Sequence, residues 1–392
     1  MEHCAFTVLL PVSLEEGRRA IPCPPKHVSL CARRFPRRSV KALVACQAQR
    51  CVTTPGRFHW NEYGRKSGNL ELDPQIVHYE TSVHDGRTDA HQQEGVPRVL
   101  LIHGFGANTT CWRATVPALT CAGYEVVAVD LLGFGQSDKP VGPVPYSIEL
   151  WAQLVLDLVA YLDQERPNHG WVLAGNSIGS LTALQAATYV LCDGQDASSQ
   201  PNVTSSSIWI RGLVLFNCAG GLVSFRSEDL SAPLAFLWKT FRGALFNDVV
   251  GNLFFERFRS PSNIRSVLLQ VYRNHTRVDD ELVSSIFMPS EHPNASRVFL
   301  QVLNAEAGPR PSDLLRALDA AEQKVPICVI WGSEDPWTPL VGGFFPGEKY
   351  PEWNSRLELS VVPNCGHLPM DDDPETVNPL MLSWFAKQFA MK

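Results

Sequence analysis

The sequence lacks the features that define several protein classes. Its 392 residues contain no run of 18 or more apolar residues, so no segment is predicted to cross a membrane as a helix. It also lacks a basic excess: the formal net charge is −6, which provides no electrostatic footprint for binding DNA or RNA. We therefore expect no nucleic-acid partner.

Regular spacings of metal ligands are missing as well. The eleven cysteines and eleven histidines show neither C-x-x-C nor H-E-x-x-H spacing. An odd number of irregularly spaced cysteines favours free thiols in a reducing compartment over a disulfide framework. The acidic run Asp371–Glu375 could attract a metal, but it directly precedes the last predicted helix, which favours helix capping. We predict no metal site and no cofactor.

Acidic residues are scarce in residues 1–50, which hold nine Lys and Arg against three Glu. This stretch therefore carries +6 and leaves −12 for the remainder of the chain, since the total is −6. An Arg-rich, acid-poor segment with scattered prolines is typical of an organelle transit peptide, and we predict one, disordered, over residues 1–50. A basic arm that stays attached to the protein is the alternative.

Beyond about residue 75, short apolar runs alternate with amphipathic stretches, which predicts a largely parallel sheet with helices on both faces. Residues 51–220 and 313–392 would form this α/β core, and Asp193–Ser207 would be a surface loop. The aromatic-rich residues 221–312 interrupt the alternation and are predicted to form a helical lid. The expected strands are 75–80, 99–102, 126–129, 171–174, 213–216, 327–330 and 357–362, and the expected helices are 113–121, 147–162, 181–191 and 374–389.

Three potentially catalytic residues each follow one of the predicted strands. Ser177 is the central residue of a G-x-S-x-G motif, at the point where a strand would turn sharply into a helix. Asp335 and His367 follow the strands that end near residues 331 and 362. Because the carboxyl ends of parallel strands meet at one edge of the sheet, the three are predicted to form a catalytic triad, with Ser177 as nucleophile.

A loop rich in glycine completes the predicted site. Residues 103–106, with the sequence His-Gly-Phe-Gly, follow the strand 99–102. Acyl transfer needs backbone N–H donors for the developing oxyanion, and we assign these donors to the amides of Phe105 and Ile178. His103 is predicted to have a structural role, bonding neighbouring backbone, rather than a catalytic one.

Several stretches carry a family resemblance that covers residues from about 97 to 389. They are "HGFGANTTCW", "VVAVDLLGFGQSDKP", "YSIELWAQLV", "VLAGNSIGSLTALQAA", "LFNCAGG", "VYRNHTRVDDELV" and "PICVIWGSEDPWTPL". On these the chain resembles the α/β-hydrolase superfamily, and within it the plastid clade of chlorophyll dephytylases and pheophytinases. The resemblance implies an α/β-hydrolase fold with a helical lid, located in the chloroplast, in the stroma or at the thylakoid. It implies hydrolysis of the phytyl ester of chlorophyll or of its magnesium-free derivative.

Aromatic side chains are the candidates for contacting such a hydrophobic ester. We single out Trp112, near the oxyanion loop, and Phe236, Trp238 and Phe241 in the lid. The alternative is that the lid aromatics form the lid's own core. An aromatic lid could also make peripheral contact with the thylakoid membrane.

Two other functions remain open at this point. The triad does not report on the pockets for the acyl and alcohol groups, so a plastid lipase or a general carboxylesterase fits the same residues. A hydrolase-fold protein that binds a ligand with little turnover is the third reading.

Overall fold

The computed structural model describes residues 29–30, 51–60, 74–84, 95–142, 144–164, 169–192, 208–222 and 248–389. The predicted leader, apart from Ser29 and Leu30, lies outside these residues, as do the predicted surface loop Asp193–Ser207 and the first part of the predicted lid.

Within the described residues, the strands form one nine-stranded sheet in the order β1-β9-β8-β7-β6-β4-β5-β3-β2. Strand β3 pairs antiparallel with both β2 and β5, whereas all other neighbouring strands are parallel. The strands are β1 (Ser29–Leu30), β2 (Cys51–Trp60), β3 (Gln75–His84), β4 (Arg98–Ile102), β5 (Val126–Val129), β6 (Trp171–Asn176), β7 (Ile210–Phe216), β8 (Ile327–Gly332) and β9 (Leu357–Val362).

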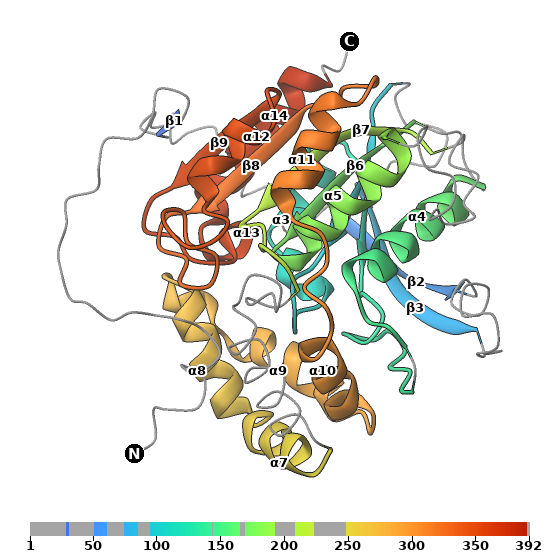
Figure 1. Cartoon of the computed structure of the whole chain (residues 1–392), viewed down its shortest axis with the longest axis vertical. Coiled ribbons are helices and arrows are strands. Elements are labelled where there is room, and N and C mark those ends of the chain that lie inside the picture. The colour runs from blue at the N-terminus through green and yellow to red at the C-terminus, as the bar shows by residue number, and fades with distance from the viewer. Residues whose placement is uncertain are drawn as a thin grey trace, which may run out of the picture.

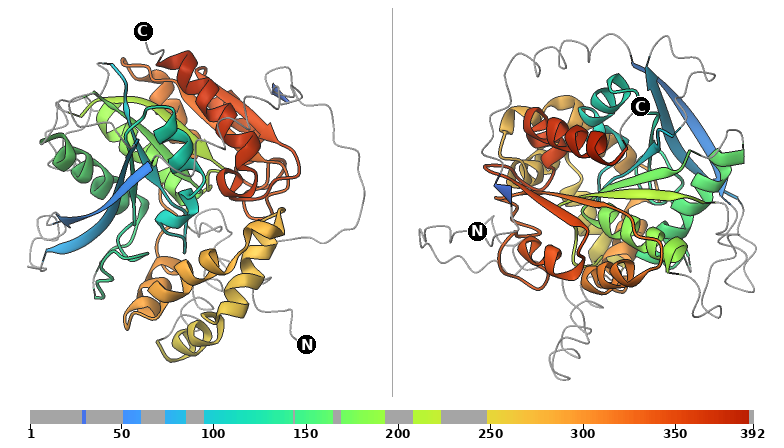
Figure 2. Two further views of the ribbon diagram at one scale, coloured as in Figure 1. Left: turned by 180° about the vertical axis from the view of Figure 1, so that it is seen from behind. Right: turned by 90° about the horizontal axis from the view of Figure 1, so that it is seen from above.

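Helices cover both faces of the sheet, as the two opposite views show (Figures 1 and 2). One face carries α4 (Ile148–Gln164), α5 (Ile178–Leu191), α11 (Pro311–Ala320) and α12 (Tyr350–Trp353), and the other carries α3 (Thr115–Cys121) and α14 (Pro374–Gln388). Because side chains alternate along a strand, β4 contributes Leu100 and Ile102 to one apolar cluster and Val99 and Leu101 to the other. The central strands β4, β5, β6, β7 and β8 are therefore buried on both faces, as their continuously apolar runs predict, whereas most of β2 is exposed.

The predicted fold class is confirmed: all seven predicted strands appear, in a mostly parallel sheet flanked by helices. Strand β1 was not predicted, and it lies within residues 1–50, where the sequence predicted disorder. Strand β2 was not predicted either, because Pro55-Gly56 in its middle is typical of a turn. It forms the edge of the sheet, where a residue without a backbone N–H is tolerated. Gly56 lets the Tyr79 ring lie across the strand, since a Cβ atom there would lie 2.2 Å from that ring.

The lid helices, a term used here for α7 to α10, lie between β7 and β8 in the sequence and together at one end of the sheet (Figure 1). They are α7 (Asp248–Phe258), α8 (Pro261–Val271), α9 (Asp280–Ser290) and α10 (Ala295–Leu303). Shorter elements are η3 (Thr109–Trp112), η6 (His275–Arg277), η7 (Gly347–Lys349) and α13 (Pro369–Asp372). In the part of the chain that the structure describes, no helix combines the length and apolar character that spanning a bilayer requires.

Candidate active site

Ser177 occupies a strained turn between strand β6 and helix α5. Its backbone has φ 56° and ψ −120°, an unfavourable conformation for a residue with a side chain. The turn is packed so tightly that both flanking glycines are required. A Cβ atom on Gly175 would lie 2.2 Å from the Gly179 carbonyl oxygen, and one on Gly179 would lie 2.2 Å from the Ile102 carbonyl oxygen. This is the geometry that a nucleophile elbow needs.

Backbone hydrogen bonds hold the elbow in this conformation. The Ser177 N–H donates to the Phe216 carbonyl at 3.0 Å, and the Ser177 carbonyl accepts from the Ala219 N–H at 3.1 Å. The buried Ser180 hydroxyl donates to the Gly175 carbonyl at 2.6 Å. The strain at Ser177 is thus balanced by bonds to the end of β7 and to its own helix.

Asp335 and His367 are brought together after strands β8 and β9. The His367 Nδ1–H donates to Asp335 Oδ2 at 2.6 Å, and both side chains are buried. Asp335 Oδ1 also accepts from the Trp337 N–H at 2.7 Å, and the Thr338 hydroxyl donates to Oδ2. Burial alone would raise the pKa of Asp335, but the charge of His367 and these hydrogen bonds outweigh it and lower the pKa.

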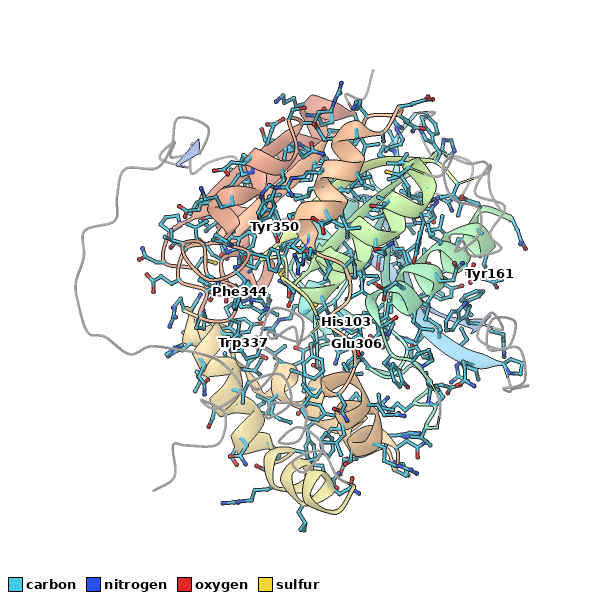
Figure 3. The ribbon with its side chains drawn as sticks, viewed as in Figure 1. His103, Tyr161, Glu306, Trp337, Phe344 and Tyr350 are labelled. Carbon is cyan, nitrogen blue, oxygen red and sulfur yellow. The ribbon has the colours of Figure 1, made fainter. Side chains whose placement is uncertain are left out.

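The histidine loop is tied directly to the elbow. Asn176, the residue before Ser177, donates from its side chain to the His367 carbonyl at 2.9 Å and to the Phe216 carbonyl at 3.2 Å. The ring of half-buried Trp337 lies beside His367, with 5.2 Å between ring centroids. Trp337 is labelled in Figure 3, at the junction between the sheet and the lid helices. The three predicted catalytic residues therefore come from adjoining segments at one edge of the sheet.

The predicted oxyanion loop lies against the same elbow. A Cβ atom on Gly104 would lie 3.1 Å from Ser177 Cβ, so the loop passes immediately beside the nucleophile. Within the described residues, neither the Phe105 nor the Ile178 N–H donates to a backbone carbonyl. These two amides are therefore available for a ligand oxygen.

His103, also labelled in Figure 3, supports this loop from within. Its Nδ1 bonds the Gly104 carbonyl at 2.7 Å, and its Nε2 accepts from the Leu131 N–H at 3.0 Å. An imidazole that donates from one nitrogen and accepts at the other is neutral. Complete burial lowers the pKa of His103, which favours the same neutral form. These bonds agree with the structural role predicted for His103.

Asn217 is a component of the site that the sequence interpretation missed. It follows β7 and donates from Nδ2 to Asp335 Oδ2 at 2.6 Å, the oxygen that His367 also contacts. Its Oδ1 accepts from the Gly332 N–H at 2.9 Å. The available signal was its position, since Asn217 follows a predicted strand just as Ser177, Asp335 and His367 do.

Of the four residues predicted to contact substrate, the structure describes only Trp112. Trp112 was predicted to contact substrate, and this is wrong. Its side chain is fully buried in the apolar cluster beneath α3 and α14, with its ring 5.7 Å from that of Phe216. Phe236, Trp238 and Phe241 lie outside the described residues.

The acidic run after His367 does more than cap a helix. Asp373 does cap α14, since its side chain accepts from the Thr376 N–H at 3.2 Å, as predicted. Asp371 and Asp372, however, are buried and face the lid. Asp371 accepts from Arg113 Nε at 3.0 Å and from the Tyr272 hydroxyl at 2.9 Å.

Asp372 connects the histidine loop to the lid. Its carboxylate accepts from the N–H groups of Gly366 at 2.7 Å, of Asn274 at 2.7 Å and of Arg273 at 3.0 Å. The His367 N–H in turn donates to the carbonyl of Val271, the last residue of α8, at 2.9 Å. The segment after α8 and the histidine loop are therefore one hydrogen-bonded unit.

Together these groups can perform nucleophilic acyl chemistry. Ser177 carries a hydroxyl on a strained, tightly packed turn, and a buried carboxylate orients His367. The loop that carries the Phe105 amide passes beside Ser177, and the Ile178 amide directly follows it. Among the described residues, no group of three or more His, Cys, Asp and Glu could hold a metal ion.

The chain is similar to a known protein family and to known hydrolases. A model described as "Alpha/beta hydrolase family" matches residues 99–380. The chain is 26% identical over 358 residues to the chloroplastic pheophytinase of Arabidopsis thaliana, covering 81% of this chain and 65% of the relative. It is 27% identical over 288 residues to a 2-hydroxymuconate semialdehyde hydrolase from Pseudomonas, covering 72% and 84%. The match therefore spans less than two thirds of the length of the pheophytinase.

Solved structures share the fold at low sequence identity. The epoxide hydrolase CorEH superposes with a TM-score of 0.58 at 21% identity, covering 86% of this chain and 99% of that one. A thermophilic esterase from Thermogutta terrifontis superposes with a TM-score of 0.56 at 21% identity, covering 86% and 100%. The likeness at this identity shows a shared fold.

Proposed function

Because the chain belongs to the α/β-hydrolase family, we propose that this hydrolase is a serine esterase that cleaves a carboxylic ester through an acyl-enzyme. The observation that carries the proposal is the bond between His367 Nδ1 and the buried Asp335, in a loop held to the Ser177 elbow by Asn176. An epoxide hydrolase of this fold would use an aspartate nucleophile, whereas the elbow residue here is serine.

In the proposed mechanism, Ser177 Oγ attacks the ester carbonyl while His367 Nε2 takes its proton. The amides of Phe105 and Ile178 donate to the oxyanion that forms. His367 then gives the proton to the leaving alcohol, and a water molecule repeats the cycle on the acyl-enzyme to release the acid. Asp335 holds the imidazole with Nε2 toward Ser177 and stabilises its protonated form.

For the substrate, we propose the phytyl ester of chlorophyll or pheophytin, so that the reaction is dephytylation. The support is the similarity to a protein named pheophytinase, together with the Phe299 ring that lid helix α10 places against Phe105. A general carboxylesterase or lipase uses the same catalytic residues, and substrate comparison is the way to separate these functions.

The proposed location is the chloroplast, supported by the composition of residues 1–50 and by the chloroplastic relative. Peripheral contact with the thylakoid membrane is part of this proposal, because chlorophyll esters are hydrophobic. Expression of the full chain fused to a fluorescent protein in plant cells tests the location, and a cytosolic signal would contradict it.

The proposed activity is tested with the full chain and the Ser177→Ala variant. Each is incubated with chlorophyll a, pheophytin a and a short p-nitrophenyl ester, and the pigments are separated by chromatography. The proposal expects dephytylated pigment from the wild type alone. Cleavage of the short ester alone would retain the serine mechanism and refute the pigment substrate. Pigment binding without turnover of any ester would instead identify a ligand-binding protein.

A further inference from the structure

A continuous row of aromatic rings connects the predicted oxyanion loop to the lid helices. The Phe105 ring lies with its centroid 5.6 Å from that of Phe134 in the core and 5.3 Å from that of Phe299 on α10. Phe299 in turn lies 5.3 Å from Phe255 on α7. The residue whose amide would bind the oxyanion is thus in direct contact with the lid.

The two ends of this row are buried, but its middle is not. Phe134 is 7% exposed and Phe255 is 9% exposed, whereas Phe105 and Phe299 are only half-buried. Aromatic side chains that serve only as core are expected to be as buried as Phe134 and Phe255. The two half-buried rings instead leave apolar surface uncovered at the predicted oxyanion loop, whose Gly104 lies beside Ser177.

Helix α10 is docked firmly enough to hold Phe299 in this place. Val298 packs so closely on Gly133 that a Cβ atom there would lie 2.8 Å from the valine methyl group. Asn294 donates to the Lys139 carbonyl at 2.9 Å, and Gln301 donates to the Gly142 carbonyl at 2.6 Å. The position of Phe299 relative to the oxyanion loop is therefore set by contacts at both ends of the helix.

We propose that Phe299 is a specificity-determining residue, whose ring forms with Phe105 an apolar wall for the hydrophobic group nearest the scissile ester. This inference rests on the proposed esterase function and adds the residue that selects the substrate class: esters with a long-chain or polycyclic apolar group. Aromatic rings suit such groups because they offer large, rigid apolar surface.

The test compares wild type, Phe299→Ala and Phe299→Leu on two ester series. One series lengthens the acyl chain of p-nitrophenyl esters, and the other lengthens the alcohol chain of acetate esters. In one of the two series, Phe299→Ala should lower kcat/KM for the longest chains about tenfold or more, while the short ester changes less than about threefold. Phe299→Leu should recover most of the loss, because it restores apolar volume.

Met288→Ala is the matched control, since Met288 is also an apolar lid residue but is 66% exposed on α9. It should leave the chain-length profile unchanged. An equal loss on every ester for Phe299→Ala would overturn the proposal and indicate that the ring only supports the Phe105 amide. Unchanged profiles in both series would also overturn it. Failure of the esterase function itself is distinguishable, because the wild type would then hydrolyse no ester faster than Ser177→Ala.

Discussion

At the scale of single residues, Asn217 meets two requirements at once: a left-handed backbone conformation and an amide side chain that both donates and accepts. Its backbone has φ 42°, in the left-handed region that asparagine tolerates better than most residues, and its amide bonds both Asp335 and the Gly332 N–H. It acts on the reaction only through Asp335 and is therefore a positioning residue.

Replacing Asn217 by glycine keeps the backbone conformation accessible and removes the amide. A hydrogen bond to a charged group contributes about 1.5–3 kcal/mol, so we expect kcat/KM to fall about 10- to 100-fold, mostly in kcat. Steady-state kinetics on a p-nitrophenyl ester measures this. Asn364→Gly is the control, because Asn364 also has a positive φ of 53° but an exposed side chain. Equal losses in the two variants would show that the backbone, not the amide, is responsible.

Asp335 is the second residue whose change is informative. Because its pKa is lowered, the carboxylate stays charged at neutral pH and needs no activation. Asp335→Asn should keep the fold and lower kcat about 10⁴-fold, since the amide favours the wrong imidazole tautomer. Circular dichroism checks the fold and steady-state rates check the loss. A variant with nearly wild-type kcat would mean that Asp335 does not orient the histidine.

At the scale of elements, the histidine loop and the root of the lid share one carboxylate. Asp372 accepts three backbone N–H bonds, one from Gly366 and two from the segment that follows α8. Its neighbour Asp373 has the simpler task of capping α14. The two residues are adjacent and chemically identical, yet the fold gives them different roles.

This difference predicts that the same substitution has a large effect at Asp372 and a small effect at Asp373. Asp372→Asn places an NH₂ group against N–H donors and should lower kcat/KM about tenfold or more, because His367 shifts with its loop. Asp373→Asn should change little, since asparagine and aspartate cap helices about equally well. Kinetics and thermal unfolding of both variants provide the comparison. A loss in Asp373→Asn as large as in Asp372→Asn would argue for general destabilisation.

The type of element decides how much of the fold and of the candidate site the sequence predicts. Buried parallel strands are continuous apolar runs, so β4, β5, β6, β7 and β8 could be recognised, and with them the positions of Ser177 and Asp335. Trp112 was misplaced because an aromatic residue near a catalytic loop looks the same in sequence whether it faces substrate or core. The roles of Asn217, Asp372 and Phe299 depend on contacts between distant segments, which periodicity does not encode.

At the scale of the whole molecule, a buried ion pair joins antiparallel strand β3 to the segment after β5, which in turn holds the start of η3. His78 on β3 bonds Asp130, which follows β5, at 2.9 Å, and Asp130 also accepts from the Thr109 N–H at 2.9 Å. Burial opposes the charged histidine, but the hydrogen bond and charge of Asp130 outweigh it and raise the pKa of His78 above 6.5. Burial likewise opposes the aspartate charge, but the bond from His78, the neighbouring histidine charges and the Gln136 N–H bond together outweigh it and lower the pKa of Asp130 below 3.8.

The signs of these shifts define a pH window for stability. The raised pKa of His78 stabilises the fold below 6.5, and this contribution is lost as pH rises through the folded value. The lowered pKa of Asp130 stabilises the fold above 3.8, and this contribution is lost as pH falls. Urea unfolding of His78→Gln should show a deficit of about 1–3 kcal/mol at pH 5 that shrinks at pH 9. An identical deficit at both pH values would mean that His78 remains neutral.

The central claim, that Ser177 is the nucleophile of this hydrolase, is tested most directly by covalent labelling. The full chain is treated with a fluorophosphonate, and the modified peptide is identified by mass spectrometry. We predict a single adduct on Ser177, absent in Ser177→Ala and much slower to form in His367→Ala, because the histidine takes the serine proton. No adduct, or an adduct on another residue at the same rate in all three proteins, would contradict the account.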